Sequence, residues 1–282
     1  MSNNFNNISP LDNRYSSKIE TVRTNFSEFA LIKIRFEIEI DWIIYLCKNK
    51  PNVFKKISES SIKKLEKFKN NFDDNYVTKI KKIESVTNHD VKAVEYFIRN
   101  YFIKDNVLKN YIQFIHFGLT SEDINSLSYA VMIKNGIDIY ITDIESLNSN
   151  LNIKACEWSD ISFLSRTHGQ PASPSTLGKE LAVFNTRLIK QIYSLKLIQP
   201  LAKFSGATGN YHTFYILDPK INWQAFTNKF IKSFGITQNT HTTQIEPHDW
   251  IAETSHSIIR INNILIDPVS YTHLTLPTIL LV

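Results

Sequence analysis

Apolar residues recur at steps of three and four positions along residues 177–195, and this spacing constrains the fold of the chain more than any other feature. Side chains at these steps lie on one face of an α-helix. Residues 121–158 carry a similar pattern over a greater length, with a weak point at Gly136. The sequence therefore predicts long amphipathic helices at about 175–199, 121–158 and 247–266, which bury their apolar faces against one another in a bundle.

Polar residues near the predicted helix ends indicate where the helices begin. Ser173 is placed to cap the first of these helices, with Pro174 in its first turn. Thr120 and Asp123 have the spacing of a capping box at the start of the second. We also predict shorter helices at 61–72, 90–99 and 222–234.

Residues 32–41 read IKIRFEIEID and alternate strictly between apolar and polar side chains. Taken alone, this alternation predicts a half-buried β-strand. A single strand would have no partner in a helical chain, and residues 42–46 are apolar on all sides, which fits a buried helix. We therefore predict a helix here, and the family resemblance described below supports the same assignment.

Glycine is scarce in this chain, with 7 glycines in 282 residues, whereas average usage gives about 20. Rossmann folds and β-barrels need many tight turns, so both are disfavoured, and the sequence contains no glycine-rich phosphate loop. The formal net charge is +5, but the lysine runs lack interleaved aromatic residues. We interpret the runs as solvated helix surfaces and expect no nucleic-acid partner.

Several features favour a cytoplasmic protein. Cys47 and Cys156 lie far apart and form neither a metal-ligand spacing nor a redox pair, so we expect a reducing compartment, no metal and no cofactor. The first residues, MSNNFNNISP, lack the pattern of a signal peptide. No apolar run approaches the roughly 18 residues of a membrane span, so no membrane partner is expected.

Five polar clusters interrupt the helical pattern, each at a predicted helix end, where free backbone N–H groups bind anions readily. They lie at 10–15, 87–92, 117–123, 165–176 and 242–249.

The fourth cluster, SRTHGQPASPST, contains the strongest single candidate for catalysis, His168. We predict a polar loop stiffened by two prolines, and imidazole titrates near neutral pH. Simpler interpretations stay open for the other clusters: a helix cap for Thr120 and Ser121, a surface turn for Arg14 and Tyr15, a cap for His89, and a structural role for His248.

Five strings, in this order, resemble the bacterial-type adenylosuccinate lyases of the fumarase/aspartase superfamily: TNHDVKAVEYF (87–97), FIHFGLTSEDIN (114–125), SRTHGQPASPST (165–176), SGATGNY (205–211) and TTQIEPHDW (242–250). The resemblance runs from about Ile8 to Asp267. The element THGQPA is shared with sister enzymes, whereas TNHDVKAVEYF and TTQIEPHD are more specific. The resemblance implies an all-α fold, with an N-terminal helical domain at 1–112 and a central long-helix bundle at 113–267 that is incomplete.

The resemblance also implies a reaction. Members of the family cleave a C–N bond by β-elimination, splitting adenylosuccinate into AMP and fumarate, and a succinylated imidazole-carboxamide ribotide into its amide and fumarate. The matching residues are His168 as general acid, Asn88, His89 and Asp90 as a substrate-contacting strip, Thr120 and Ser121 as hydroxyl donors to a succinyl carboxylate, Arg14 and Tyr15 at the nucleotide phosphate, and Gln244 as another substrate contact.

The resemblance further implies a homotetramer with active sites composed from three subunits, and a nucleotide as the small-molecule substrate. Two alternatives remain: a sister enzyme similar to argininosuccinate lyase, and a non-catalytic helical scaffold. The two specific strings argue against the first. The intact His168, His89, Thr120 and Ser121 argue against the second.

The last residues, 268–282, depart from the resemblance. Pro268 stands where family members continue a helix, and a proline breaks a helix interior. Residues 269–278, VSYTHLTLPT, match one reading frame of a common sequencing-library adapter, so we expect a non-native tail. The family's serine-bearing loop, which supplies the general base, would follow in the native protein. We therefore expect this chain alone to be inactive and, because its apolar faces are uncovered, poorly soluble.

Overall fold

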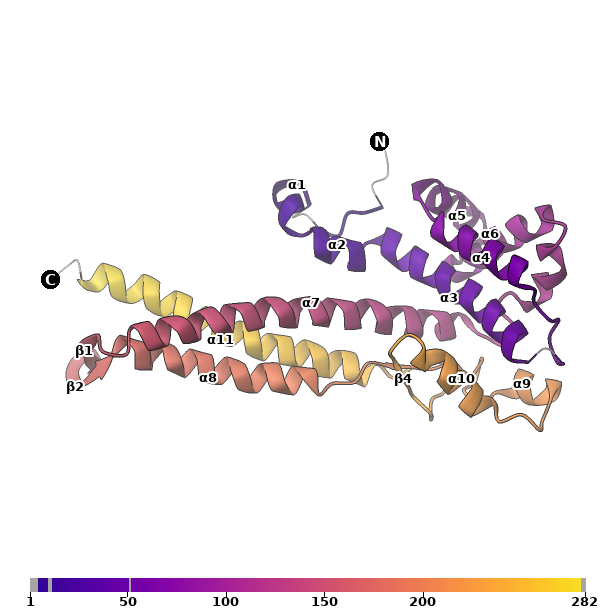
Figure 1. Cartoon of the computed structure of the whole chain (residues 1–282). Helices are drawn as coiled ribbons and strands as arrows, with labels where there is room; N and C mark the ends of the chain where they lie inside the picture. The colour runs from indigo at the N-terminus through magenta and orange to yellow at the C-terminus, as the bar shows by residue number, and fades with distance from the viewer. Residues whose placement is uncertain (1–4, 10–11, 51, 280–282) are drawn as a thin grey trace. The chain divides into compact units, whose positions relative to one another are not determined.

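The computed structural model describes residues 5–9, 12–50 and 52–279, with side chains described except for Asn13 and residues 270–279. The chain is predominantly helical, with two small two-stranded sheets in the described part (Figure 1). The all-α prediction is confirmed. The elements are α1 (Asp12–Tyr15), α2 (Glu20–Phe26), α3 (Glu28–Asn49), α4 (Glu59–Asn70), α5 (Asp74–Thr87), α6 (Asp90–Lys104), α7 (Ser121–Glu157), β1 (Ser162–Thr167), β2 (Gln170–Thr176), α8 (Leu177–Lys196), β3 (Leu201–Ala202), α9 (His212–Leu217), α10 (Trp223–Lys232), β4 (Thr237–Gln238) and α11 (Asp249–Ile279), with 3-10 helices η1 (Ser16–Lys18) and η2 (Leu108–Phe114).

The chain divides into two compact units. Unit 1 comprises residues 1–136 and 200–247, and unit 2 comprises residues 137–199 and 248–282. The predicted domains at 1–112 and 113–267 are a different division of the chain and stay a prediction.

Helix α3 forms the centre of unit 1. Its Phe36 ring lies 4.9 Å from Phe68 and 5.1 Å from Phe72, measured between ring centroids. The ring of Trp42 lies 4.9 Å from Phe204 and 5.0 Å from Phe230. These aromatic contacts surround α3 with segments far apart in the sequence, and this burial stabilises the unit.

The strand-like alternation of residues 32–41 therefore belongs to a helix, as predicted. The helix is buried around much of its circumference, because Ile38, Ile40 and Ile43 are all fully buried. Two of the alternating polar residues, Arg35 and Glu39, are buried as well. A helix enclosed in this way needs no amphipathic period, which explains why its sequence resembles a strand.

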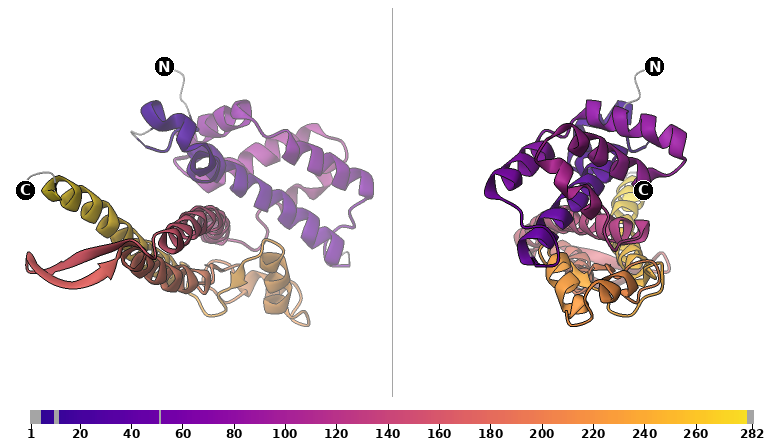
Figure 2. Two further views of the ribbon diagram at one scale, coloured as in Figure 1. Left: turned by 60° about the vertical axis from the view of Figure 1, so that its left-hand side comes forward. Right: turned by 90° about the vertical axis from the view of Figure 1, so that its right-hand side faces the viewer.

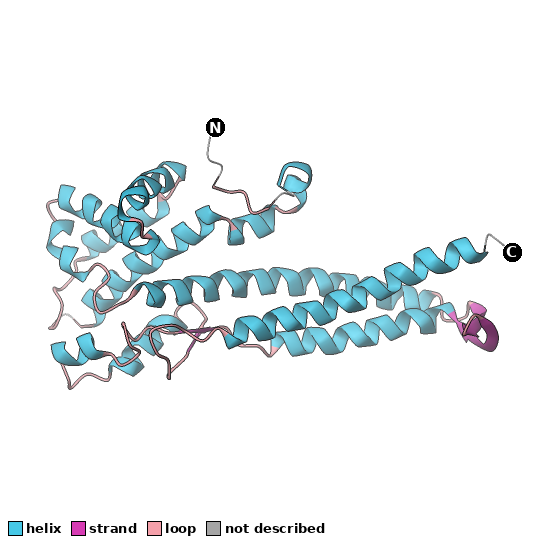
Figure 3. Ribbon diagram, turned by 180° about the vertical axis from the view of Figure 1, so that it is seen from behind, coloured by secondary structure: helices cyan, strands magenta, loops and turns pink. Residues whose placement is uncertain are grey.

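Unit 2 consists of the last part of α7, the β1–β2 hairpin, α8 and α11 (Figure 3). Helices α8 and α11 run antiparallel, because Arg187 pairs with Asp267 at 2.7 Å while Arg260 donates to Gln191 at 2.8 Å. The side chain of Asn185 donates to the carbonyl of Asn148 at 2.9 Å and so ties α8 to α7.

The segment predicted as a polar loop is instead a β-hairpin. Strands β1 and β2 pair antiparallel, with Leu164 opposite Pro174 and Arg166 opposite Pro171 (Figure 2). Each strand of a two-stranded ribbon is an edge strand, where a proline whose nitrogen faces outward removes no hydrogen bond of the pairing. The predicted helix cap at Ser173 is wrong, because Ser173 lies in strand β2. The cap of α8 is Thr176, whose side chain accepts from the Lys179 backbone N–H at 3.3 Å.

Two other predicted interruptions of helices also differ from the structure. Helix α7 passes through Gly136 without a break, and a Cβ atom at this position would overlap the ring of Phe26. Helix α11 continues through Pro268 to Ile279, so the predicted end near Ile266 is wrong. A proline removes one backbone donor and bends the helix, but the turns on either side keep their own hydrogen bonds. The identification of 268–282 as a non-native tail stays a prediction.

None of the helices in the described part of the chain has both the length and the apolar character that crossing a membrane requires.

Candidate functional site

His89 and Ser121 form the contact around which the candidate site of unit 1 is built. His89 caps α6, and its Nδ1 accepts from the Lys92 backbone N–H at 3.3 Å. On the other side of the ring, Nε2 lies 3.3 Å from the Ser121 Oγ at the start of α7. Because Nδ1 accepts, the neutral ring carries its proton on Nε2 and donates to Ser121. His89 is therefore both a helix cap and part of the site.

Asp90 brings a negative charge to His89. Its Oδ1 lies 3.5 Å from the His89 Nδ1, and its Oδ2 lies 2.8 Å from a guanidinium nitrogen of Arg35. Burial raises the pKa of Asp90, but the charge of Arg35, the Val91 N–H and the Arg35 hydrogen bond outweigh it, so the pKa is lowered. The Asp90 carboxyl group therefore stays ionised beside the imidazole.

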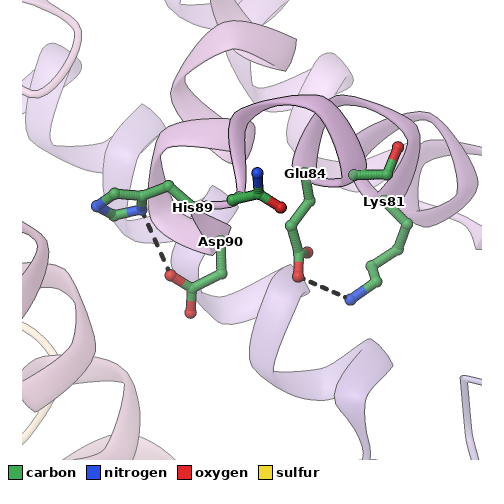
Figure 4. Close-up of a pocket in the computed structure, with 6 residues that line it drawn as sticks. Lys81, Glu84, His89 and Asp90 are labelled. Carbon is green, nitrogen blue, oxygen red and sulfur yellow. Dashed lines mark hydrogen bonds and ion pairs between the residues drawn. The ribbon is translucent and has the colours of Figure 1, made fainter.

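A cavity of about 700 Å³ opens beside these residues (Figure 4). Asn88, His89 and Asp90 line it together with Lys81, Glu84 and Ser85. The Lys81 ammonium bonds to Glu84 at 3.0 Å and to Glu28 at 2.7 Å. Asn88 ends α5 in the left-handed conformation, with a φ of 50°, which asparagine adopts more readily than most residues. The three residues predicted as one strip thus line one cavity.

Thr120 lies next to this contact, at the entrance to α7. Its backbone N–H donates to the Asp123 Oδ2 at 2.7 Å, so this half of the predicted capping box is confirmed. Asp123 also accepts from the backbone N–H groups of Ser205 at 2.8 Å and Gly206 at 3.1 Å. The start of α7 is thereby tied to the segment 203–211.

The segment 242–246, which carries Gln244, packs against the same region. Ser205 Oγ lies 3.5 Å from Thr242 Oγ1, and the backbone N–H of Glu246 donates to Glu122 at 3.3 Å. The side chain of Glu246 is buried and accepts from Asn239 at 2.8 Å. Gln244 itself is exposed. Four of the five strings recognised in the sequence, 87–97, 114–125, 205–211 and 242–250, therefore have residues that meet within unit 1.

Sequence reasoning missed two residues of this region, the half-buried His116 and the buried Lys203. His116 has its Nδ1 2.5 Å from a Glu39 oxygen and its Nε2 3.7 Å from Glu95. Lys203 pairs with Asp123 at 2.9 Å, and both side chains are fully buried. A signal for His116 was its position inside the string FIHFGLTSEDIN. Lys203 offered none, because a lysine between apolar neighbours usually lies at the surface.

Arg14 and Tyr15 lie on the short helix α1 at the N-terminal side of unit 1. Both side chains are exposed, and the Arg14 guanidinium lies 5.4 Å from the centre of the Tyr15 ring. Asp12 anchors this helix by accepting from the backbone N–H groups of Ser9 at 2.5 Å and Ile8 at 2.8 Å. An exposed guanidinium can bind a phosphate while it keeps its contact with the aromatic ring.

His168 belongs to unit 2, at the tip of the β1–β2 hairpin. His168 and Gly169 have φ values of 54° and 74°, and Thr167 pairs with Gln170. Positive φ at both central positions is typical of a two-residue type I′ turn. Arg166 donates to the Gly169 carbonyl at 3.4 Å, and the His168 side chain is exposed. The imidazole is thus presented to solvent by a rigid turn.

Among the described side chains, no group of three or more His, Cys, Asp and Glu residues is arranged to hold a metal ion.

The strips that converge in unit 1 and the long helices of unit 2 belong to a predominantly helical chain. The sequence model of the family described as Lyase matches residues 13–268, and the chain belongs to this family. Curated relatives named adenylosuccinate lyase include those of Buchnera aphidicola subsp. Schizaphis graminum, 42% identical over 267 residues, Legionella pneumophila (strain Corby), 43% over 266, and Escherichia coli (strain K12), 41% over 264. These alignments cover 94%, 93% and 92% of this chain, but 59%, 58% and 58% of the relatives.

Two solved structures share the fold. A fumarate lyase from Mesorhizobium sp. BNC1 superposes with a TM-score of 0.69 at 17% identity, covering 91% of this chain and 58% of that one. The β-carboxy-cis,cis-muconate cycloisomerase from Acinetobacter calcoaceticus sp. ADP1 superposes with a TM-score of 0.72 at 16% identity, covering 93% and 59%. At these identities the likeness concerns the fold alone.

Proposed function

We propose that the protein carrying this chain is an adenylosuccinate lyase. It eliminates fumarate from adenylosuccinate, giving AMP, and from succinylaminoimidazole carboxamide ribotide. The observation that carries the proposal is the 3.3 Å contact between His89 and Ser121, which joins two of the family-like strips at one cavity. The relatives named above support the choice of substrate.

The reaction needs a site for the carboxylates of the succinyl group. Thr120 and Ser121 supply hydroxyl groups at the start of α7, a helix whose N-terminal dipole favours an anion. These donors stabilise the charge that builds on a carboxylate once the adjacent carbon loses its proton. Asn88, His89 and Asp90 contact the reacting portion from the neighbouring cavity.

The proposed elimination proceeds through a carbanion. A base removes a proton from the carbon next to a carboxylate, and the electron pair forms the double bond of fumarate. The C–N bond breaks, and His168 protonates the departing nitrogen. In the family resemblance the base is a serine on a mobile loop, and Arg14, Tyr15 and Gln244 bind the rest of the nucleotide.

We further propose a cytoplasmic homotetramer whose substrate is a nucleotide and whose function requires no nucleic acid and no membrane. Exposed apolar side chains on the helices of unit 2 support association between subunits. They include Ile189, 52% exposed, Tyr193, 64%, and Ile266, 60%. Apolar groups at this exposure are stabilised when another subunit removes them from water.

A sister lyase similar to argininosuccinate lyase and a non-catalytic scaffold are the alternatives. Ligand binding distinguishes them. A ligand that binds the folded state raises its free energy of unfolding by about 2.7 kcal/mol at a hundredfold excess over Kd. We expect AMP to raise the Tm of the complete protein and arginine to leave it unchanged. A response to arginine alone favours the sister lyase, and a response to neither favours the scaffold.

A further inference from the structure

Helix α3 carries three buried polar groups along one face. Arg35 is 4% exposed, Glu39 is fully buried, and Trp42 is fully buried with its indole N–H bonded. These positions are separated by four and three residues, so their side chains lie on the same side of the helix. Buried polar groups are rarely retained without partners, and the partners here all lie at the candidate site.

The first of the three groups holds the 88–90 strip. The guanidinium of Arg35 bonds to Asp90 at 2.8 Å, with the arginine side chain 5% exposed. Asp90 in turn faces the His89 Nδ1 at 3.5 Å. The 2.8 Å charge-assisted bond to Arg35 fixes the Asp90 carboxylate. It thereby fixes the side of the His89 imidazole on which this carboxylate lies.

The other two groups hold the segment leading into α7. One oxygen of Glu39 accepts from the His116 backbone N–H at 3.1 Å, and the other contacts the His116 ring at 2.5 Å. Trp42 donates from its indole N–H to the Phe117 carbonyl at 3.0 Å.

The turn that follows is fixed by packing. Gly118 has a φ of 75°, and a Cβ atom there would overlap the ring of Phe214. Thr120 and Ser121 come directly after it. Helix α3 thus holds both the segment 88–90 and the segment 116–121. The position of His89 relative to Ser121 therefore depends on this one buried helix.

We propose that Arg35 and Glu39 are positioning residues that set the contact between His89 and Ser121. Their catalytic effect rests on the function proposed above, whereas the positioning itself does not. Arg35 acts through Asp90, and Glu39 acts through the backbone and ring of His116. Neither is assigned a contact with substrate.

The competing interpretation is that these two residues only stabilise the fold. Losing a buried charged group destabilises a protein whatever its neighbours do. Local amide exchange separates the two cases, because a general loss of stability accelerates exchange throughout a cooperative unit, whereas a lost anchor accelerates it at the anchored strip.

The first experiment measures hydrogen–deuterium exchange by mass spectrometry in the complete protein. We expect Arg35→Gln to accelerate exchange about tenfold at residues 88–92, and Glu39→Gln to do so at 115–121, the effect of losing one charge-assisted hydrogen bond. Lys33→Gln is the matched control, because Lys33 lies on the same helix but is 44% exposed and 3.9 Å from Glu37. Unchanged exchange at both strips, or a uniform rise across unit 1, overturns the proposal.

The second experiment is a double-mutant cycle of Arg35 and His89, in which the release of fumarate from adenylosuccinate is measured. Arg35→Gln should lower kcat about tenfold or more in the wild-type background, since small misplacements of reacting groups are costly. In a His89→Ala background it should cost little, and Arg35→Lys should restore part of the loss. Equal losses in both backgrounds contradict action through His89. If the wild type releases no fumarate, the proposed function fails, and the exchange pattern still decides the positioning.

Discussion

Lys203 and Asp123 form an ion pair of 2.9 Å in which both side chains are fully buried. The Lys203 ammonium also donates to the Gly206 carbonyl at 2.8 Å, while Asp123 accepts from the backbone of Thr120 and Ser205. The pair thus joins the start of α7 to the segment 203–211, and it satisfies charges that would otherwise lie unpaired in the interior.

Replacing Lys203 by methionine should lower the free energy of unfolding by about 3–5 kcal/mol, because the substitution leaves the Asp123 carboxylate buried without its cation. Denaturant unfolding followed by circular dichroism measures the change. The matched control is Lys196→Met, since Lys196 pairs with Glu145 with both side chains about half exposed, at 47% and 49%. We expect that control to change stability by less than about 1 kcal/mol. Similar losses for the two variants would contradict the structural role of the buried pair.

His116 should make stability depend on pH. Burial lowers the pKa of His116, but the negative charges of Glu39, Glu95 and Asp123 outweigh it and hold the pKa above the usual 6.5. Glu95 is itself paired with Lys92 at 2.8 Å. A histidine whose pKa is raised by folding contributes its full stabilisation below the unfolded-state pKa and loses it as the pH rises through the folded-state pKa.

The free energy of unfolding should therefore fall as the pH is raised through the folded-state pKa of His116, which lies above the usual 6.5, and the fall should be smaller in His116→Gln. Denaturant titrations of both proteins at pH values below and above that pKa test it. An identical pH dependence in the variant would show that another group is responsible.

Much of the helical architecture could be predicted from the sequence, and the failures have local causes. The three- and four-residue steps locate α7 and α8 because one face of each helix packs while the other meets water. Residues 32–41 hide the helix α3, since Arg35 and Glu39 are buried polar residues and the helical period is lost. The hairpin at 165–176 was missed because its prolines suggest a loop, although a two-stranded ribbon tolerates them.

The candidate site was predicted in part. His89 and Ser121 were identified and do come together, since the family resemblance named both strips. Arg35, Glu39, His116 and Lys203 were not identified, because their importance depends on partners distant in sequence. Only the fold shows that Glu39 meets His116 and that Lys203 meets Asp123. The roles of all nine predicted site residues stay predictions.

Gly209 should not tolerate alanine. It has a φ of 79°, and a Cβ atom there would overlap the carbonyl oxygen of Thr242. Gly169 at the hairpin tip has a similar φ of 74° with open space around it. Both Gly→Ala variants carry the strain of a left-handed conformation, but only Gly209→Ala adds a clash, which costs about a further 1–3 kcal/mol. Equal losses in free energy of unfolding would mean that 205–211 and 242–246 are not in close contact.

His168→Ala should lower the turnover of adenylosuccinate by about 10²–10⁴, the usual contribution of a general acid. The control is His256→Ala, because His256 is an exposed histidine on α11 of the same unit and outside the candidate site. Steady-state kinetics of the complete protein provide the measurement. Near-normal turnover in His168→Ala would remove this residue from the mechanism.

The most direct test of the proposed function is product analysis with adenylosuccinate and argininosuccinate offered separately to the complete protein. We predict that AMP and fumarate appear in equal amounts from adenylosuccinate and that argininosuccinate is left intact. Release of arginine and fumarate from argininosuccinate, or no product from either compound, would contradict the assignment as an adenylosuccinate lyase.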